Sequence, residues 1–174
     1  HTKVDEATGE LLFFNYSKEA PYMHYGVVDA QGQLAHYIPI ELPGPRLPHD
    51  MGFTDNFAIL HDFPFFWDPE ALKHNAHAVR FNKSMPTRLG VIPRRGAPED
   101  IRWFEAEPTY VLHVINCYED GDEIVMDGYA QKDPTHFSLL ETGCHAYRWR
   151  MNQTTGKVTE GPLEDVFSEF GMIN

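Results

Sequence analysis

Short strand-like segments separated by turn residues run through almost the whole chain and constrain its fold more than any other feature. Each segment is apolar, or alternates between apolar and polar residues, over a length typical of a β-strand, and none has the periodicity of a long helix. These segments are residues 11–16, 22–28, 34–40, 57–63, 88–92, 101–104, 110–117, 123–129, 145–151 and 157–159. They are separated by predicted hairpin loops, rich in residues that tolerate positive φ, at 7–9, 29–32, 119–122 and 152–156. The window 68–77 opens with Pro69 but is short, so we expect a loop there with at most one helical turn.

A hairpin signature, strand followed by an acidic or amide turn, Gly and a second strand, recurs along the chain. It reads V-D-E-A-T-G-E-L at 4–11, V-D-A-Q-G-Q-L at 28–34 and M-N-Q-T-T-G-K-V at 151–158. Repeated hairpins among short strands favour the blades of a β-propeller, although a β-sandwich built from meanders gives a similar pattern. The pattern therefore predicts an all-β fold and leaves propeller and sandwich open.

Length and charge limit the kinds of protein that this chain represents. Its 174 residues suffice for one domain with a real core, no apolar stretch approaches the roughly 20 residues of a membrane span, and both ends look cut, so we expect an interior piece of a longer protein. With 26 acidic and 14 basic side chains, the net charge of −12 repels phosphate backbones, which disfavours nucleic-acid binding. Two cysteines are too few for a disulfide scaffold and indicate a reducing compartment, so the expected location is the cytoplasm.

Three of the ten histidines, His1, His49 and His113, lie in strand-like or strand-entering segments far apart in the chain. A compact metal motif such as H-E-x-x-H places its histidines a few residues apart, so these three can share an ion only if a large β fold brings them together. For most of the others the expected state is solvated or hydrogen-bonded, because they lie beside polar or turn residues: His24, His36, His61, His74, His77, His136 and His145.

His113 differs from those histidines in its predicted surroundings. By strand alternation it shares one apolar face with Val111, Ile115 and Cys117. A neutral imidazole on such a face must satisfy two nitrogens, either as a metal ligand or through hydrogen bonds to the backbone. For His49 the alternatives are a ligand and an ordinary loop histidine. The residues alone do not decide between these readings.

Other chemistries find less support in the sequence. An N-terminal histidine such as His1 can chelate copper through its amino group and imidazole together with a second histidine, but enzymes of that kind are usually secreted and disulfide-bonded. The acidic run 119–123 lacks the spacing of an EF-hand calcium loop and is better explained as a solvated turn. The sequence also lacks the hydrolase G-x-S-x-G, P-loop and Rossmann glycine patterns.

Four longer stretches closely resemble the carotenoid oxygenase family, in order and over nearly the whole chain. They are H-D-M-G-F-T-D-N-F-A-I-L-H-D-F-P at 49–64, R-F-N-K-S-M-P-T-R-L-G-V-I-P-R at 80–94, R-W-F-E-A-E-P-T-Y-V-L-H-V-I-N-C-Y-E-D-G-D at 102–122, and Y-R-W-R-M-N with T-G-K-V at 147–158 followed by S-E-F-G-M-I-N. That family includes carotenoid and apocarotenoid cleavage dioxygenases, stilbene-cleaving dioxygenases and the retinoid isomerohydrolase.

The resemblance implies a seven-bladed β-propeller with one non-haem Fe(II) on its axis, held by four histidines. In this chain His49, His113 and His1 match three of the ligands, while the fourth falls outside it. Glu169 matches a glutamate that accepts a hydrogen bond from a ligand imidazole, which we assign to His113. Such a carboxylate fixes the tautomer of the ring and makes it a stronger ligand. Residues 1–174 would then form a single incomplete domain, about three blades from the central part of the propeller.

The activity implied by the resemblance is cleavage of a carbon–carbon double bond in a conjugated apolar substrate by O₂, giving two carbonyl products. The isolated piece should be a poor enzyme, because it lacks one ligand and leaves strand edges unpaired. Three positions depart from the family pattern without removing a matched ligand: Asp55, Cys117 and Gly171. The alternatives are a β-propeller binding module without catalysis and a propeller hydrolase that uses a divalent ion, which would favour carboxylate and Asn ligands. Carotenoid, apocarotenoid and stilbene substrates, peripheral membrane contact and the oligomeric state all stay open, and no protein partner is indicated.

Overall fold

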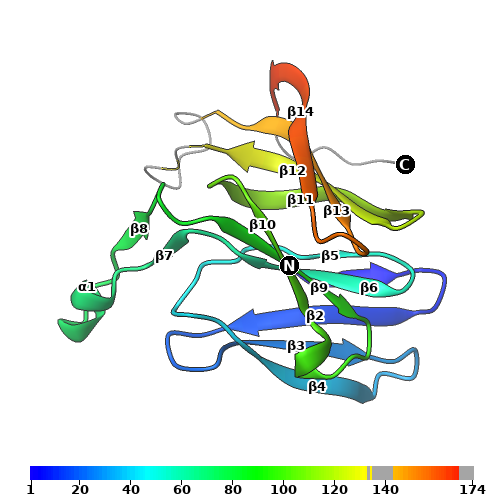
Figure 1. Cartoon of the computed structure of the whole chain (residues 1–174). Helices are drawn as coiled ribbons and strands as arrows, with labels where there is room; N and C mark the ends of the chain where they lie inside the picture. The colour runs from blue at the N-terminus through cyan, green and yellow to red at the C-terminus, as the bar shows by residue number, and fades with distance from the viewer. Residues whose placement is uncertain (133, 135–142, 169–174) are drawn as a thin grey trace.

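The strand and turn pattern folds into three four-stranded antiparallel sheets that follow one another along the chain (Figure 1). The structure is a computed structural model that describes residues 1–132, 134 and 143–168. The first sheet contains β1 (Lys3–Asp5), β2 (Glu10–Tyr16), β3 (Tyr22–Val28) and β4 (Leu34–Glu41). The second contains β5 (Gly52–Phe53), β6 (Phe57–Asp62), β9 (Thr87–Pro93) and β10 (Arg102–Ala106). The third contains β11 (Tyr110–Asp120), β12 (Glu123–Gln131), β13 (His145–Asn152) and β14 (Val158–Phe167).

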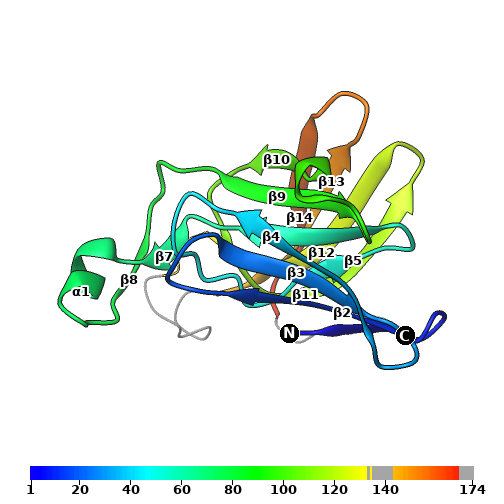
Figure 2. The ribbon, with the colours of Figure 1, turned by 90° about the horizontal axis from the view of Figure 1, so that it is seen from below.

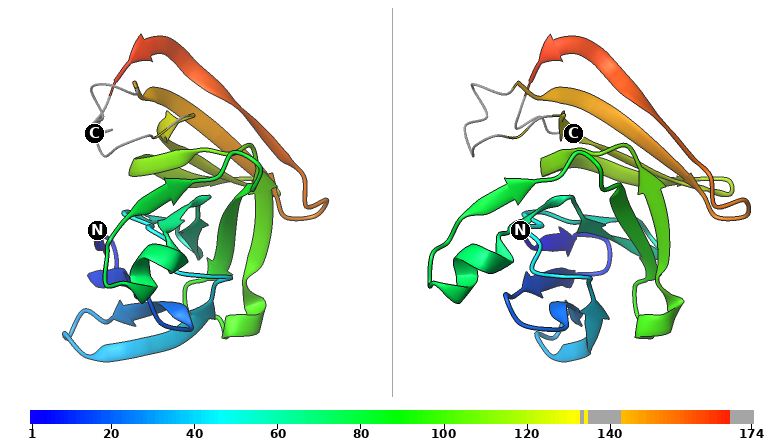
Figure 3. Two further views of the ribbon diagram at one scale, coloured as in Figure 1. Left: turned by 90° about the vertical axis from the view of Figure 1, so that its left-hand side faces the viewer. Right: turned by 60° about the vertical axis from the view of Figure 1, so that its left-hand side comes forward.

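A two-stranded ribbon interrupts the second sheet between β6 and β9. It consists of β7 (Phe65–Trp67), the short helix α1 (Pro69–Lys73) and β8 (Val79–Phe81). The ribbon and α1 extend away from the stacked sheets (Figures 2 and 3). The helix confirms the single turn predicted within 68–77, and a 3₁₀ turn at Pro98–Asp100 joins β9 to β10. In the described part of the chain, no helix is long and apolar enough to cross a membrane.

Each four-stranded sheet is a meander whose strands pair in chain order, as in a propeller blade, so we call the sheets the first, second and third blades. This arrangement confirms the predicted all-β fold of about three blades. The recurring hairpin signature lies at the turns β1–β2, β3–β4 and β13–β14. Two of these turns belong to the same blade, so the signature marks a hairpin rather than a whole blade.

Two hydrophobic clusters join the blades to one another. Along β6, Ala58 and Leu60 pack into the cluster shared with the first blade, and Ile59 packs with Phe63 into the cluster shared with the third. All four are fully buried. Full burial of a large apolar side chain contributes about 1.5–3 kcal/mol, so these contacts hold the blades in a fixed relation. The sheet-edge strands β1, β5 and β11, one from each blade, are placed by that packing.

The structure departs from the predicted alternation in β11. The pairing register with β12 shifts between Val111 and Val114 and again between Val114 and Asn116. Such bulges add a residue to one strand and turn the side chains that follow it. As a result Val111 packs between the second and third blades, whereas Ile115 packs against a separate cluster within the third. The prediction that Ile115 shares a face of the strand with Val111 and His113 is therefore wrong.

Candidate metal centre

The three dispersed histidines converge at the edge strands of the three blades. The ring centroids of His1 and His49 lie 4.8 Å apart, those of His1 and His113 5.3 Å, and those of His49 and His113 5.5 Å. One ligand nitrogen from each ring lies within 4.8 Å of the other two. His1 precedes β1, His49 lies in the loop before β5, and His113 is in β11. The predicted convergence of residues separated by about fifty and sixty-four positions is thus present in the fold.

The segments that carry the histidines are tied together by their backbones. The backbone nitrogen of His1 donates a hydrogen bond to the carbonyl oxygen of His49 over 2.8 Å. The loop before β5 is itself anchored, because Leu47 is buried and its N–H donates to the carbonyl oxygen of Phe65.

The donor set suits one divalent transition-metal ion. Within the described residues the cluster contains imidazoles alone, with neither carboxylate nor thiol. Neutral imidazoles are good ligands for iron, zinc, copper and nickel, whereas calcium and magnesium prefer oxygen. Two nitrogens each about 2.1 Å from one ion lie at most about 4.2 Å apart. The 4.8 Å limit observed here is slightly longer than that span, so the three nitrogens must move closer together to bind a common ion.

The protonation state of His49 favours ligand binding. Burial lowers the pKa of its imidazole below 6.5, and the neighbouring His113 ring lowers it further. A lowered pKa keeps the ring neutral near pH 7, with a nitrogen lone pair available to a metal.

Asp50 is the buried charge closest in sequence to these histidines, and sequence reasoning missed its role. Its side chain is 2% exposed and pairs with the ammonium of Lys3. Burial alone would raise the pKa of Asp50, but Lys3 and the backbone N–H groups of Val114 and Met51 outweigh that effect and hold the pKa below its usual value. The carboxylate is therefore ionised in the folded protein. An Asp next to a candidate ligand, at the start of a buried stretch, was the available signal.

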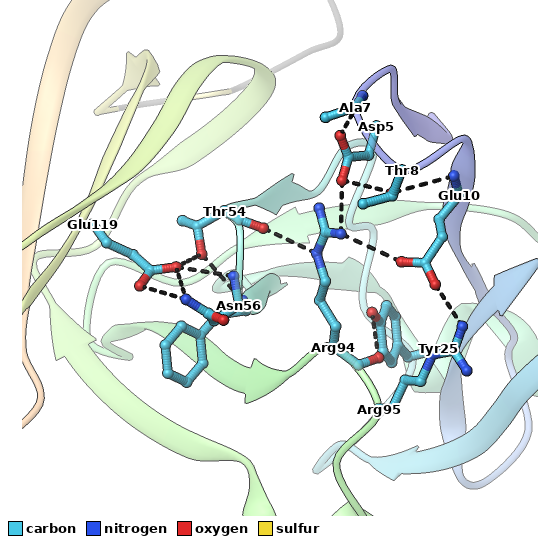
Figure 4. A network of polar contacts seen from close by, with 11 residues as sticks. Asp5, Ala7, Thr8, Glu10, Tyr25, Thr54, Asn56, Arg94, Arg95 and Glu119 are labelled. Carbon is cyan, nitrogen blue, oxygen red and sulfur yellow. Dashed lines mark hydrogen bonds and ion pairs between the residues drawn. The ribbon is translucent and has the colours of Figure 1, made fainter. Parts of the chain in front are cut away.

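A second polar network connects the far ends of the same edge strands (Figure 4). The Arg94 guanidinium pairs with Asp5 at 2.8 Å and with Glu10 at 3.3 Å, both from the first blade. Its Nε donates to the carbonyl oxygen of Thr54, just after β5, over 3.0 Å. The hydrogen bond from Arg94 is the largest cause that lowers the pKa of Asp5. The network therefore joins the first and second blades through an ionised carboxylate.

Glu119 extends this network to the third blade. Its carboxylate accepts hydrogen bonds from the Thr54 hydroxyl over 2.6 Å and from the Asn56 backbone N–H over 2.9 Å. Desolvation raises the pKa of Glu119, and these hydrogen bonds more than reverse that effect. The acidic run 119–123 lies at the β11–β12 hairpin, as expected, and its first residue, although exposed, also anchors β11 to the loop after β5.

The prediction that His61 is solvated or hydrogen-bonded is wrong. Its ring is fully buried in β6, and neither ring nitrogen has a hydrogen-bond partner among the described residues. Burial lowers its pKa to about 4, so the ring is neutral at pH 7. It lies 4.8 Å, centroid to centroid, from the ring of Phe63. The apolar run 57–63 was the signal for burial. Two other predicted positions, Glu169 and His136, lie outside the described residues.

A cavity of about 350 Å³ opens between β5 and β11, and none of the three histidines is among its lining residues. Its lining includes Lys3 and Val114, which flank the histidines, and the side chains of Phe53 and Cys117. This volume is at the lower end of the range for small-molecule sites.

The whole chain resembles parts of longer known proteins. The sequence profile of the retinal pigment epithelial membrane protein (RPE65) family matches residues 1–174. The chain is 31% identical over 184 residues to carotenoid 9,10(9′,10′)-cleavage dioxygenase 1 of Pisum sativum, covering 100% of this chain and 34% of that protein. Over 130 residues it is 34% identical to isoeugenol monooxygenase of Pseudomonas putida, covering 73% of this chain and 27% of that protein. Its fold matches the crystal structure of Pseudomonas brassicacearum lignostilbene dioxygenase with a TM-score of 0.82 and 25% identity, over 95% of this chain and 38% of that one.

Proposed function

Because the chain belongs to the retinal pigment epithelial membrane protein (RPE65) family, the carotenoid oxygenase family that its motifs resemble, we propose that it is part of a non-haem Fe(II)-dependent dioxygenase. It spans about a third of the length of the pea relative that it matches, 34%, as expected for a piece of a longer protein. We propose that residues 1–174 form the central, single incomplete domain of the propeller. The activity described below belongs to the full-length protein, meaning the natural polypeptide that carries this sequence with its flanking regions.

The proposed iron ligands in this chain are His1, His49 and His113, and a fourth histidine from outside it completes the set. The observation that carries this proposal is the convergence of the three rings, whose ligand nitrogens lie within 4.8 Å of one another. We also propose that Glu169 accepts a hydrogen bond from the His113 ring and so fixes its tautomer. Neutral ligands leave the double positive charge of Fe(II) uncompensated, which suits an ion that is to bind O₂.

When bound, Fe(II) would supply the activation of O₂ next to the substrate double bond. In the overall reaction the carbon–carbon double bond breaks, each of its carbons forms a double bond to one oxygen atom of O₂, and no external reductant is consumed. The residues of this chain contribute by holding three imidazoles at one point. His49 does so in its neutral form, because burial lowers its pKa.

The proposed substrate is a small, apolar, conjugated alkene. Relatives are named for cleavage of carotenoids and lignostilbene and for oxidation of isoeugenol, which all contain a conjugated double bond. The cavity between β5 and β11 has apolar lining from Phe53, Val114 and Cys117. We propose the cytoplasm as the location, because both cysteines are free thiols. The net charge of −12 argues against a nucleic-acid partner.

The test is product analysis with the iron-loaded full-length protein and ¹⁸O₂. A carotenoid, an apocarotenal, a stilbene and isoeugenol serve as substrates, and the expected products are carbonyl compounds that together carry both oxygen atoms of one O₂ molecule. His49→Ala should abolish product formation, while His74→Ala serves as the matched control because His74 is exposed next to α1. If wild type consumes no O₂ with any of these alkenes, the protein is a binding module rather than a dioxygenase.

A further inference from the structure

Asp50 connects all three of the segments that carry the converging histidines. Its Oδ2 accepts the backbone N–H of Val114 over 2.9 Å and the Lys3 ammonium over 3.0 Å. Its Oδ1 accepts the backbone N–H of Met51 over 2.9 Å and lies 2.9 Å from the same ammonium. With 2% of the residue exposed, the carboxylate has little access to water. Both of its oxygens are therefore committed to protein donors from three blades.

Each of these donors lies close in sequence to one of the three histidines. Lys3 is two residues after His1, Met51 is two residues after His49, and Val114 directly follows His113. Val114 also lies between the two register shifts of β11, where the regular strand pairing cannot hold the backbone by itself. A fixed carboxylate at this point therefore limits how far the histidine segments can move relative to one another.

The chemistry of the carboxylate explains why an aspartate is suited to this position. Hydrogen bonds to an ionised acceptor are roughly twice as strong as neutral ones. An asparagine of the same size has one accepting oxygen and no charge, so in either orientation its NH₂ group faces the backbone N–H of Met51 or of Val114 without accepting from it, and the Lys3 ammonium loses its ion pair. The Asp50→Asn substitution therefore keeps the volume of the side chain and weakens the connection among β1, β11 and the loop before β5.

We propose that Asp50 is a positioning residue that sets the spacing of the three imidazoles by connecting their segments, without itself binding the metal. The proposal rests on the proposed function only in taking those imidazoles as metal ligands. It goes beyond that function because it identifies what holds the ligands in place before a metal arrives. The carboxylate itself is not part of the cluster of metal-ligating atoms formed by the three histidines.

The test measures Co(II) binding to metal-free full-length protein by competition with a chelator, together with the visible spectrum of the Co(II) form. For Asp50→Asn we expect about 10- to 100-fold weaker binding, the range found when groups behind metal ligands are removed, and a changed spectrum. The matched control is Asp68→Asn. Asp68 is also buried and also accepts from a cation, Arg80, and from backbone N–H groups, those of Glu70 and Ala71, but it lies at α1. This control should keep the affinity and spectrum of wild type.

Lys3→Met provides a second variant if Asp50→Asn does not fold. It leaves the two backbone donors in place, so a several-fold loss of Co(II) affinity is expected, and Lys3→Arg should restore most of it. Wild-type affinity and spectrum in folded Asp50→Asn, or in Lys3→Met if the former does not fold, would overturn the proposal. An equal loss of affinity in Asp68→Asn would also overturn it. If wild type itself does not bind Co(II), the proposed function fails, which is a separate result.

Discussion

Replacing His61 by leucine should stabilise the protein and make it less sensitive to acid. The imidazole of His61 is fully buried, and its two nitrogens find no partner among the described residues. A buried polar group without a partner costs about 1–3 kcal/mol, so His61→Leu, which is similar in volume, should raise the free energy of unfolding by about that amount at pH 7.5. The unfavourable burial of this ring therefore outweighs anything that it contributes through its contact with Phe63.

The pH dependence of the free energy of unfolding is a second, independent test of the burial of His61. Burial lowers the pKa of His61 from 6.5 to about 4 in the folded state, so between these values the unfolded chain binds more protons than the folded one. Stability is therefore lost as the pH falls through 6.5 toward 4, by about 3 kcal/mol in total, since one pKa unit corresponds to about 1.4 kcal/mol. This share of the acid sensitivity should be absent from His61→Leu.

The assay is urea unfolding of the metal-free full-length protein at several pH values between 4.5 and 7.5, followed by tryptophan fluorescence. Trp149 is buried and reports on the interface between the second and third blades. His74→Leu is the control, because it makes the same substitution at an exposed histidine outside the hydrophobic clusters. The reasoning is refuted if His61→Leu has the same pH dependence as wild type, or if it is less stable than wild type at pH 7.5.

Two further substitutions test buried contacts of the second blade. A Cβ at Gly52 would lie 2.3 Å from the Sγ of Cys117, so Gly52→Ala should lower the free energy of unfolding by about 1–3 kcal/mol, and Cys117→Ala in the same chain should restore it. Thermal unfolding of the single and double variants measures this, and equal loss in both would contradict the contact. Asp62→Asn leaves the buried Arg46 and the partly buried Arg88 without their carboxylate and should cost about 3–5 kcal/mol in urea unfolding, whereas a loss below about 1 kcal/mol would show that the pairs contribute little.

The sequence predicted the regular part of the fold well, because strand length, alternation and turn residues are local properties. It did not predict β5 or the strands of the ribbon, which are only two or three residues long. Such short strands form because neighbouring strands provide partners, and a single segment carries no sign of that. The two bulges of β11 escaped prediction for the same reason, and with them the true surroundings of Ile115.

The residues of the candidate site could likewise be predicted only in part. Spacing alone could not bring His1, His49 and His113 together, and the expectation that they meet came from the family resemblance of whole stretches. Asp50 and His61 were missed because their importance arises from packing. Asp50 has partners from three blades and His61 has none in the described residues; the neighbouring sequence signals burial but not these partners or their absence.

The central claim, that imidazoles from three blades hold one ferrous ion, is tested most directly by iron content and iron X-ray absorption of the full-length protein. We predict one iron per chain in wild type with nitrogen neighbours at about 2.1 Å, and loss of most of that iron in His1→Ala, His49→Ala and His113→Ala, but not in His74→Ala. Full iron content and an unchanged absorption spectrum in any one of the first three variants would contradict the assignment of that histidine, and the same result in all three would contradict the centre itself.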